Sequence, residues 1–214
     1  MGIKENILRI RKTLPSSVSL MAVTKQRTLE EIKEAVSYGV LVIGENYVQE
    51  AALKYPQLSL VEKHFIGHLQ RNKIGKALEI FDWIDSVDSI ELAQEISKRA
   101  TRKVPVLVQV NAGSESQKSG LKQSDVSSFI KEISKLPNID VKGLQIVAPL
   151  HETSEQSRAY FKEMKTLFDS IKRENISHVS MEVLSMGMTS DYLVAVSEGS
   201  TLVRVGEGIF GKRK

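Results

Sequence analysis

The sequence predicts a (β/α)8 TIM-type barrel with an extra helix at the N-terminus, and three observations support this. Eight apolar runs of strand length recur along the 214 residues. Their hydrophobicity is continuous instead of alternating, which is typical of parallel strands buried on both faces. Segments with helical spacing and helix start signals lie between them. No Gly-x-Gly-x-x-Gly follows the first strand, so the pattern favours a closed barrel over an open doubly wound sheet.

The elements follow one another in strict alternation. An N-terminal helix is indicated by apolar residues that fall on one helical face, namely Ile3, Ile7, Leu8, Ile10 and Leu14. The expected strands then cover residues 18–24, 40–44, 64–67, 83–87, 104–111, 143–148, 179–184 and 201–205.

Capping signals mark where two of the intervening helices begin. Thr28 and Glu31 have the spacing of a capping box, and Gly39 stands where the same helix must stop. The segment Asp88-Ser89-Ile90-Glu91 has a similar pattern, with Asp88 as its capping residue. These signals place helices after the first and fourth strands.

Composition limits the kind of protein further. The chain is 41% hydrophobic and 26% charged, and no Pro-, Gly- or Ser-rich segment divides it, so we expect one domain over residues 1–214. No signal pattern or long apolar run is present, which predicts a cytoplasmic protein without membrane contact. The absence of cysteine excludes disulfides and thiolate metal sites, and the four histidines lack zinc-site spacing, so we expect no metal. The net charge of +4 is scattered, which does not favour nucleic-acid binding.

The candidate site residues come at the carboxyl ends of the expected strands. In such barrels, catalytic and binding groups gather at that end, with phosphate commonly on the loops after strands seven and eight. Lys25 ends the first strand, Ser185 and Thr189 follow the seventh, and Arg204 and Gly206 end the eighth. Closure makes strands one and eight neighbours, which brings the lysine and the arginine together. A lysine beside a phosphate-binding turn indicates a phosphorylated aldehyde as ligand.

Lys25 and the turn from Ser185 to Thr189 each have a second interpretation. Burial at the barrel mouth would disfavour the charged form of the Lys25 amine and make it available for a Schiff base, but the residue also fits an exposed surface lysine. The turn offers hydroxyls and backbone amides to a phosphate. Alternatively, Thr189 or Ser190 only caps the following helix.

Arg204 lies inside an apolar run and therefore needs a partner. If it donates to the nitrogen of a pyridoxal ring, that nitrogen stays unprotonated and the ring is a weak electron sink, compatible with α-proton exchange or with simple storage. The alternative is a structural salt bridge to Glu45 or Glu207. His64 opens the expected third strand, and we interpret it as a hydrogen-bonded core residue instead of a catalyst.

Several ordered motifs carry a resemblance that spans nearly the whole chain. They are Ala22-Val23-Thr24-Lys25, the segments 44–50 and 64–73, and the C-terminal segments 184–189 and 203–211. With these motifs the chain resembles the pyridoxal-phosphate homeostasis proteins, a family similar to the N-terminal barrel of alanine racemase (fold type III). The resemblance implies pyridoxal 5'-phosphate (PLP) as cofactor, bound to Lys25 as a Schiff base, with Arg204 facing the ring nitrogen. It implies a phosphate site made by Ser185, Thr189, Gly206 and Glu207.

The role of the segment 44–50, which follows the second expected strand, stays open. Asn46 would lie near the cofactor, or it could be the N-cap of a helix that begins at Tyr47. Glu45 could orient either Asn46 or Lys25.

The resemblance implies a binding protein instead of an enzyme. Racemases have a second domain that supplies a tyrosine as second base, and we expect this chain to lack it because it ends at Lys214, after the eighth strand. Racemisation needs a proton acceptor on each face, and the sequence does not place Tyr47 or His68 there. We expect a monomer that holds PLP, limits the free aldehyde and delivers it to apoenzymes. The alternatives are a weak amino-acid racemase and a cofactor-free Schiff-base aldolase.

Overall fold

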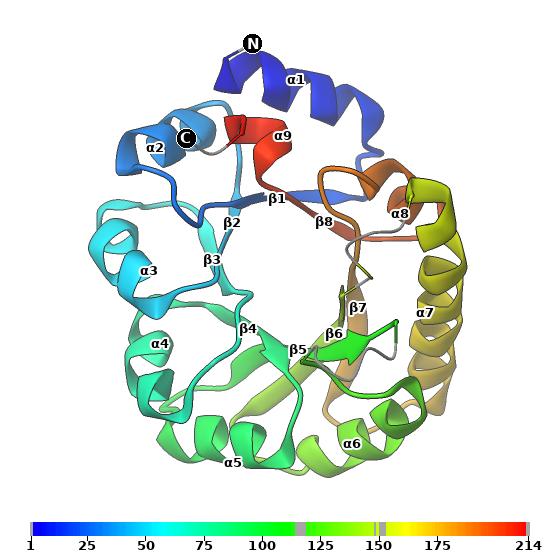
Figure 1. Ribbon diagram of the computed structural model, residues 1–214. Helices are drawn as coiled ribbons and strands as arrows, with labels where there is room; N and C mark the ends of the chain where they lie inside the picture. Colours follow the sequence, from blue (N-terminus) through cyan, green and yellow to red (C-terminus); the bar gives the residue numbers. More distant parts are fainter. Residues whose placement is uncertain (1, 114–118, 148, 150–152, 213–214) are drawn as a thin grey trace.

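A computed structural model of the chain describes residues 2–113, 119–147, 149 and 153–212, and it contains a closed barrel of parallel strands (Figure 1). The strands are β1 (Ser19–Val23), β2 (Val42–Glu45), β3 (Glu62–Phe65), β4 (Trp83–Val87), β5 (Val104–Asn111), β6 (Ile139–Val147), β7 (Val179–Ser185) and β8 (Leu202–Val205). Strand β1 pairs with β2 on one side and with β8 on the other, where Met21 is in register with Arg204. The predicted (β/α)8 architecture is therefore confirmed.

Helices surround the barrel and connect successive strands (Figure 1). They are α1 (Ile3–Thr13), α2 (Leu29–Ser37), α3 (Val48–Lys54), α4 (Ile74–Ile80), α5 (Ile90–Arg99), α6 (Val126–Ile133), α7 (Ser154–Glu174), α8 (Tyr192–Ser197) and α9 (Glu207–Phe210). The extra N-terminal helix α1 packs against α9, so the two ends of the chain lie together (Figure 1). Among the described residues, no helix is long and apolar enough to cross a membrane.

Two strands begin earlier than the sequence pattern indicated. Strand β3 begins at Glu62 instead of His64, because Glu62 and Lys63 pair with the first residues of β2. Strand β6 begins at Ile139 instead of Gly143. Its first half alternates buried and half-buried positions, where Asp140 and Lys142 form an ion pair of 3.1 Å. These polar residues interrupt the apolar run in the sequence although the backbone pairing with β5 continues. The expected end of that strand, Ala148, lies outside the described residues.

The capping predictions hold for α2 and need correction for α5. The Thr28 hydroxyl accepts from the Glu31 amide, and Gly39 follows the helix with φ at +87°. At α5 the N-cap is Ser89, whose hydroxyl accepts from the Leu92 amide. Asp88 instead accepts a hydrogen bond from the Gly120 amide and joins two loops.

The buried residues form an apolar layer and a polar interior. Leucine, isoleucine, valine and phenylalanine side chains fill the space between strands and helices. Other strand positions carry buried polar side chains from five different strands: His64, Asp85, Gln109, Gln145 and Arg204. Because buried polar groups need partners, this interior is the place to look for a site.

Candidate functional site

A cavity of about 500 Å³ opens at the carboxyl ends of the strands. Its size lies within the range of small-molecule sites, about 300–1,000 Å³. The lining residues come from the ends of β1, β2, β3, β6 and β8 and from the loop after β7: Val23, Lys25, Asn46, Ile66, Gln145, Val147, Met188, Thr189, Ser190, Arg204, Gly206 and Glu207. Six of the seven residues expected from the sequence are among them. The seventh, Ser185, is not.

Lys25 lies in a turn directly after β1 and is partly buried. The turn is closed by a hydrogen bond from the Arg27 amide to the Thr24 carbonyl (3.1 Å), and the Thr24 amide donates to Gly44 (2.9 Å). Gln26 has a left-handed backbone (φ +58°), and its amide donates to the Glu50 carboxylate (2.8 Å). The backbone on both sides of Lys25 is therefore held in place.

A buried ion-pair network fixes this turn to the second strand. The Lys54 ammonium contacts the Glu45 carboxylate (2.8 Å), the Glu50 carboxylate (2.9 Å) and the Thr24 carbonyl (3.1 Å). Glu45 is fully buried, and its other oxygen accepts from the amide of Asn46 (2.7 Å). The network thus connects the loop of Lys25 with that of Asn46. Sequence reasoning missed Lys54, although the four-residue spacing from Glu50 is a recognisable helical pair.

Arg204 lies in β8 and is 7% exposed. Its guanidinium donates to the Ser185 carbonyl (2.9 Å), the Ser185 hydroxyl (2.6 Å) and the Ile146 carbonyl (2.7 Å). Burial lowers the pKa of Arg204 to about 10, partly offset by the charges of Asp85 and Asp191, so the group remains cationic at neutral pH. Arg204 forms no salt bridge with Glu45 or Glu207, its two suggested partners. It is oriented by neutral groups and also borders the cavity.

The turn after β7 differs from the expected phosphate site in one respect. Ser185 is fully buried beside Arg204, and Ser190 borders the cavity together with Thr189. The suggested helix cap is also wrong, because the N-cap of α8 is Asp191. The Thr189 hydroxyl accepts instead from the Gly208 amide in α9 (3.2 Å), which joins the loops after β7 and β8.

Helix α9 begins at Glu207 with Gly206 as its N-cap. The first amides of a helix lack partners within the helix, so this end can bind an anion. Arg27 holds the helix by donating to the carbonyls of Phe210 and Gly211, with its guanidinium 5.4 Å from the Phe210 ring centre. The Asn6 amide of α1 donates to the Ile209 carbonyl (2.9 Å). These contacts hold α9 at its C-terminal end, and its first residues, Gly206 and Glu207, border the cavity.

Two carboxamides at the cavity have unused hydrogen-bonding capacity. Asn46 Oδ1 and Gln145 Oε1 are buried, and neither has a hydrogen-bond partner among the described residues. Gln145 is held by Gln109, whose Oε1 accepts from Gln145 Nε2 (3.1 Å). Asn46 is not a helix cap, because the N-cap of α3 is Tyr47. Since buried polar atoms in folded proteins are almost always paired, both residues favour a polar ligand in this cavity.

His64 is a core residue, as predicted. Its Nδ1 lies 2.9 Å from both Asp85 oxygens, its Nε2 lies 2.9 Å from Glu62, and its ring stacks on Trp83. Burial disfavours the charged imidazole, but the charge of Asp85 and the hydrogen bonds of Asp85 and Glu62 prevail and raise the pKa of His64 to about 9. His64 does not line the cavity. It stabilises the interior below it.

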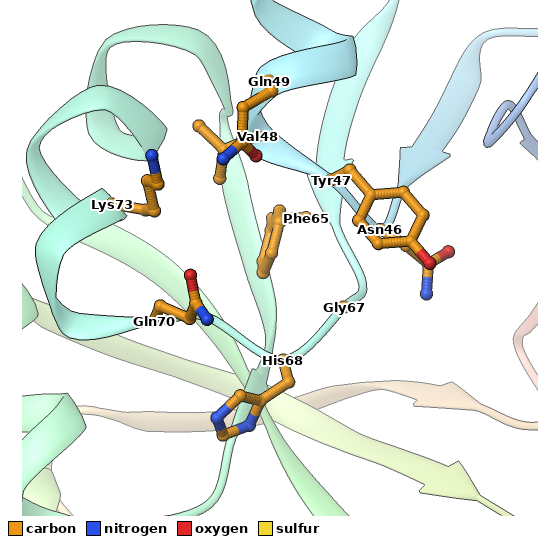
Figure 2. A pocket seen from close by; sticks show the side chains of 9 residues that line it. All are labelled: Asn46, Tyr47, Val48, Gln49, Phe65, Gly67, His68, Gln70 and Lys73. Atoms are coloured by element: carbon orange, nitrogen blue, oxygen red, sulfur yellow. The ribbon is translucent and has the colours of Figure 1, made fainter.

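Tyr47 and His68 lie in a neighbouring cavity, which Asn46 also borders (Figure 2). Neither side chain lines the cavity of Lys25. Among the described residues, no group of three or more His, Cys, Asp or Glu side chains could hold a metal ion. The side chains at the barrel mouth offer an amine, a guanidinium, hydroxyls, carboxamides and the Glu207 carboxylate, and backbone amides lie beside them. This set suits a phosphorylated carbonyl compound.

Comparison with known proteins agrees with this geometry. The family model of the alanine racemase N-terminal domain matches residues 2–214. A pyridoxal phosphate homeostasis protein from Pasteurella multocida is 36% identical over 100% of this chain and 98% of its own length. The chain belongs to the pyridoxal phosphate homeostasis protein family. A second family member, from Aquifex aeolicus, is 39% identical over 91% of this chain and 87% of its own length.

Solved structures place the homeostasis family within a wider fold. PipY of Synechococcus elongatus PCC7942, solved with PLP bound, has a TM-score of 0.90 and 36% identity, covering 98% of this chain and 100% of its own. An alanine racemase from Clostridium difficile 630 has a TM-score of 0.77 at 17% identity, covering 99% of this chain and 57% of its own. The second likeness shows the shared barrel fold alone.

Proposed function

We propose that this protein binds PLP in the cavity at the barrel mouth and takes part in intracellular PLP homeostasis. The observation that carries the proposal is the convergence of Lys25, Arg204 and the Gly206–Glu207 helix end on one cavity. The PLP-bound structure of PipY, a full-length relative, supports it. PLP supplies a reactive aldehyde and a ring that withdraws electrons.

The residues of this chain divide the binding task between them. The Lys25 amine forms a Schiff base with the aldehyde. The Thr189 and Ser190 hydroxyls and the amides of Gly206 and Glu207 hold the phosphate, where the helix end favours negative charge. Ser185 acts indirectly, by orienting Arg204 with two hydrogen bonds.

Arg204 faces the ring nitrogen in this proposal. Because a guanidinium is a donor and does not give up its proton near neutral pH, the ring nitrogen stays unprotonated. The unpaired carboxamide oxygens of Asn46 and Gln145 accept hydrogen bonds from donors on the ligand. The apolar walls from Val23 and Val147 exclude water from the ring faces.

The same lining favours a carrier over a racemase. Lys25, Arg204 and Glu207 are the titratable lining residues, and Tyr47 and His68 border the other cavity. We propose further that the protein is a cytoplasmic monomer that holds PLP reversibly and releases it to apoenzymes. Exchange of the α-proton of added amino acids in deuterated water would instead identify a racemase.

The decisive experiment is borohydride reduction of protein reconstituted with PLP, followed by peptide mass mapping. We expect a phosphopyridoxyl group on the peptide that contains Lys25, and no adduct in a folded Lys25→Ala variant. Arg204→Ala should shift the absorbance of the bound aldehyde. A protein that takes up no PLP under reduction would refute the proposal and favour the cofactor-free aldolase. An adduct that persists in Lys25→Ala would assign the Schiff base to another lysine.

A further inference from the structure

A second cavity, of about 430 Å³, lies between the carboxyl ends of β2 and β3 and the helices α3 and α4 (Figure 2). Its apolar part is made by the ring of Phe65 and the side chain of Val48. Polar side chains surround them, namely Gln49, His68, Gln70 and Lys73. Figure 2 shows these groups arranged around Phe65. The cavity combines an apolar surface with several hydrogen-bond donors.

The charges at this cavity are of one sign. None of its lining residues is acidic. Neighbouring cations are neutralised, because Arg71 pairs with Glu95 (2.8 Å) and Lys76 pairs with Glu79 (2.7 Å). By contrast, no carboxylate in the described part of the chain lies within ion-pair distance of Lys73. A cation left without a protein partner beside an acid-free cavity favours an anionic ligand.

The donors match a small oxyanion. The Lys73 ammonium, the His68 imidazole and the carboxamides of Gln49 and Gln70 can all donate hydrogen bonds to phosphate or carboxylate oxygens. The aromatic floor suits the carbon part of such a molecule. We propose that this cavity is a second binding site, which takes a small organic anion with a phosphate or carboxylate group.

The second site adjoins the first through one backbone contact. Asn46 borders both cavities. Gly67, which also lines the second cavity, packs against the backbone of Asn46. A Cβ at Gly67 would lie 2.2 Å from the Asn46 carbonyl oxygen. Asn46 is thus a wall that the two cavities share.

The test is a titration of ¹⁵N-labelled, PLP-free protein with sodium phosphate, sodium succinate and sodium chloride at matched ionic strength. The backbone amides of His68, Gln70 and Lys73 report on the second cavity. The amides of Gly206 and Glu207 report separately on the first. This readout distinguishes the two sites and does not depend on PLP binding.

The matched variants are Lys73→Met and Lys76→Met, two neighbouring lysines of which one borders the cavity. We expect phosphate or succinate, but not chloride, to shift the second-cavity amides in a saturable way. Lys73→Met should weaken that binding about tenfold or more, because it removes a charge-assisted hydrogen bond, whereas Lys76→Met should not. A response to phosphate alone would indicate a phosphorylated ligand, and one to succinate alone a carboxylate. Equal shifts with chloride, no saturable shift, or unchanged binding in Lys73→Met would each overturn the proposal.

Discussion

Replacement of Lys54 by methionine should destabilise the protein strongly, because it removes the counterion of a buried carboxylate. The Lys54 side chain is 11% exposed, and its partner Glu45 is fully buried. Methionine keeps most of the side-chain volume and has a similar helix propensity, so the change mainly removes the charge. The Glu45 carboxylate then stays buried without a counterion.

The expected cost follows from the contacts of Glu45. Loss of one partner of a buried ion pair typically costs about 3–5 kcal/mol. Glu45 keeps hydrogen bonds from the amides of Asn46 and Tyr47 and from the Thr24 hydroxyl, which offset part of the lost attraction. We therefore expect the lower end, about 3 kcal/mol. That is a large fraction of the roughly 5–15 kcal/mol by which domains are stable.

Urea unfolding followed by fluorescence measures this cost, since Trp83 is the single tryptophan and stacks on His64 inside the fold. With a denaturant slope of about 3 kcal/mol/M, the midpoint should fall by about 1 M. The matched control is Lys131→Met, which breaks an exposed pair with Glu174 and should cost about 0–1 kcal/mol. If Lys54→Met cost no more than Lys131→Met, the buried ion pair would not stabilise the two site loops as argued.

Three further changes test other parts of the fold. Gly67→Ala should cost about 1–3 kcal/mol because its Cβ meets backbone, whereas Gly75→Ala, which meets nothing within 4 Å, should be neutral or stabilising in the same unfolding assay. The pKa of His64 rises from 6.5 to about 9 on folding, so its stabilising contribution is complete below pH 6.5 and lost as the pH rises through 9. This contribution is on the order of 3 kcal/mol and should disappear from the pH profile of Asp85→Asn. Arg27→Met should release α9 and increase hydrogen exchange there, since it removes hydrogen bonds from a charged group.

Each of these changes has a distinct contradicting result. Equal stability of the two glycine variants would show that the close approach at Gly67 is readily relieved. A stability profile that is flat from pH 6 to 9 would contradict a charged His64 in the folded state. For Arg27, the control is Arg102→Met, whose donors reach the carbonyls of Phe81 and Asp82 elsewhere. If the amides of α9 exchanged their hydrogens equally fast in both variants, Arg27 would not be stabilising that helix.

The barrel could be predicted from the sequence because its signals are local and strong. Continuous apolar runs identify buried parallel strands, and Thr28 and Gly39 mark a helix start and stop. The polar start of β6 could not be predicted in the same way. Asp140 and Lys142, two residues apart on the same strand, form an ion pair with each other and interrupt the apolar pattern. Only the backbone pairing with β5 reveals that they belong to a strand.

The sequence predicted those site residues whose place depends only on where a strand ends. Lys25 follows β1 and Arg204 lies near the end of the neighbouring strand β8, so closure of the barrel brings them to one cavity. The sequence does not show which of Ser185 and Ser190 borders the cavity. Both hydroxyls lie near the end of β7, and only the three-dimensional course of the chain places Ser190, and not Ser185, at the cavity. The contact of Lys54 with Glu45 could not be predicted for a similar reason. Glu45 lies nine residues earlier, and the contact exists only when α3 folds back on β2.

The attachment of α9 to α1 and to the loop after β1 also bears on how the protein is made. Lys25 leaves the ribosome early, but the helix end at Gly206 follows about 180 residues later. At a synthesis rate of roughly 5–20 residues per second, some 10–40 seconds separate the two. Arg27 and Asn6 have no partner in α9 before then, and β1 has no β8 beside it. The cavity consequently exists only after residues 202–210 have left the ribosome, so a shorter nascent chain cannot sequester a ligand at this site.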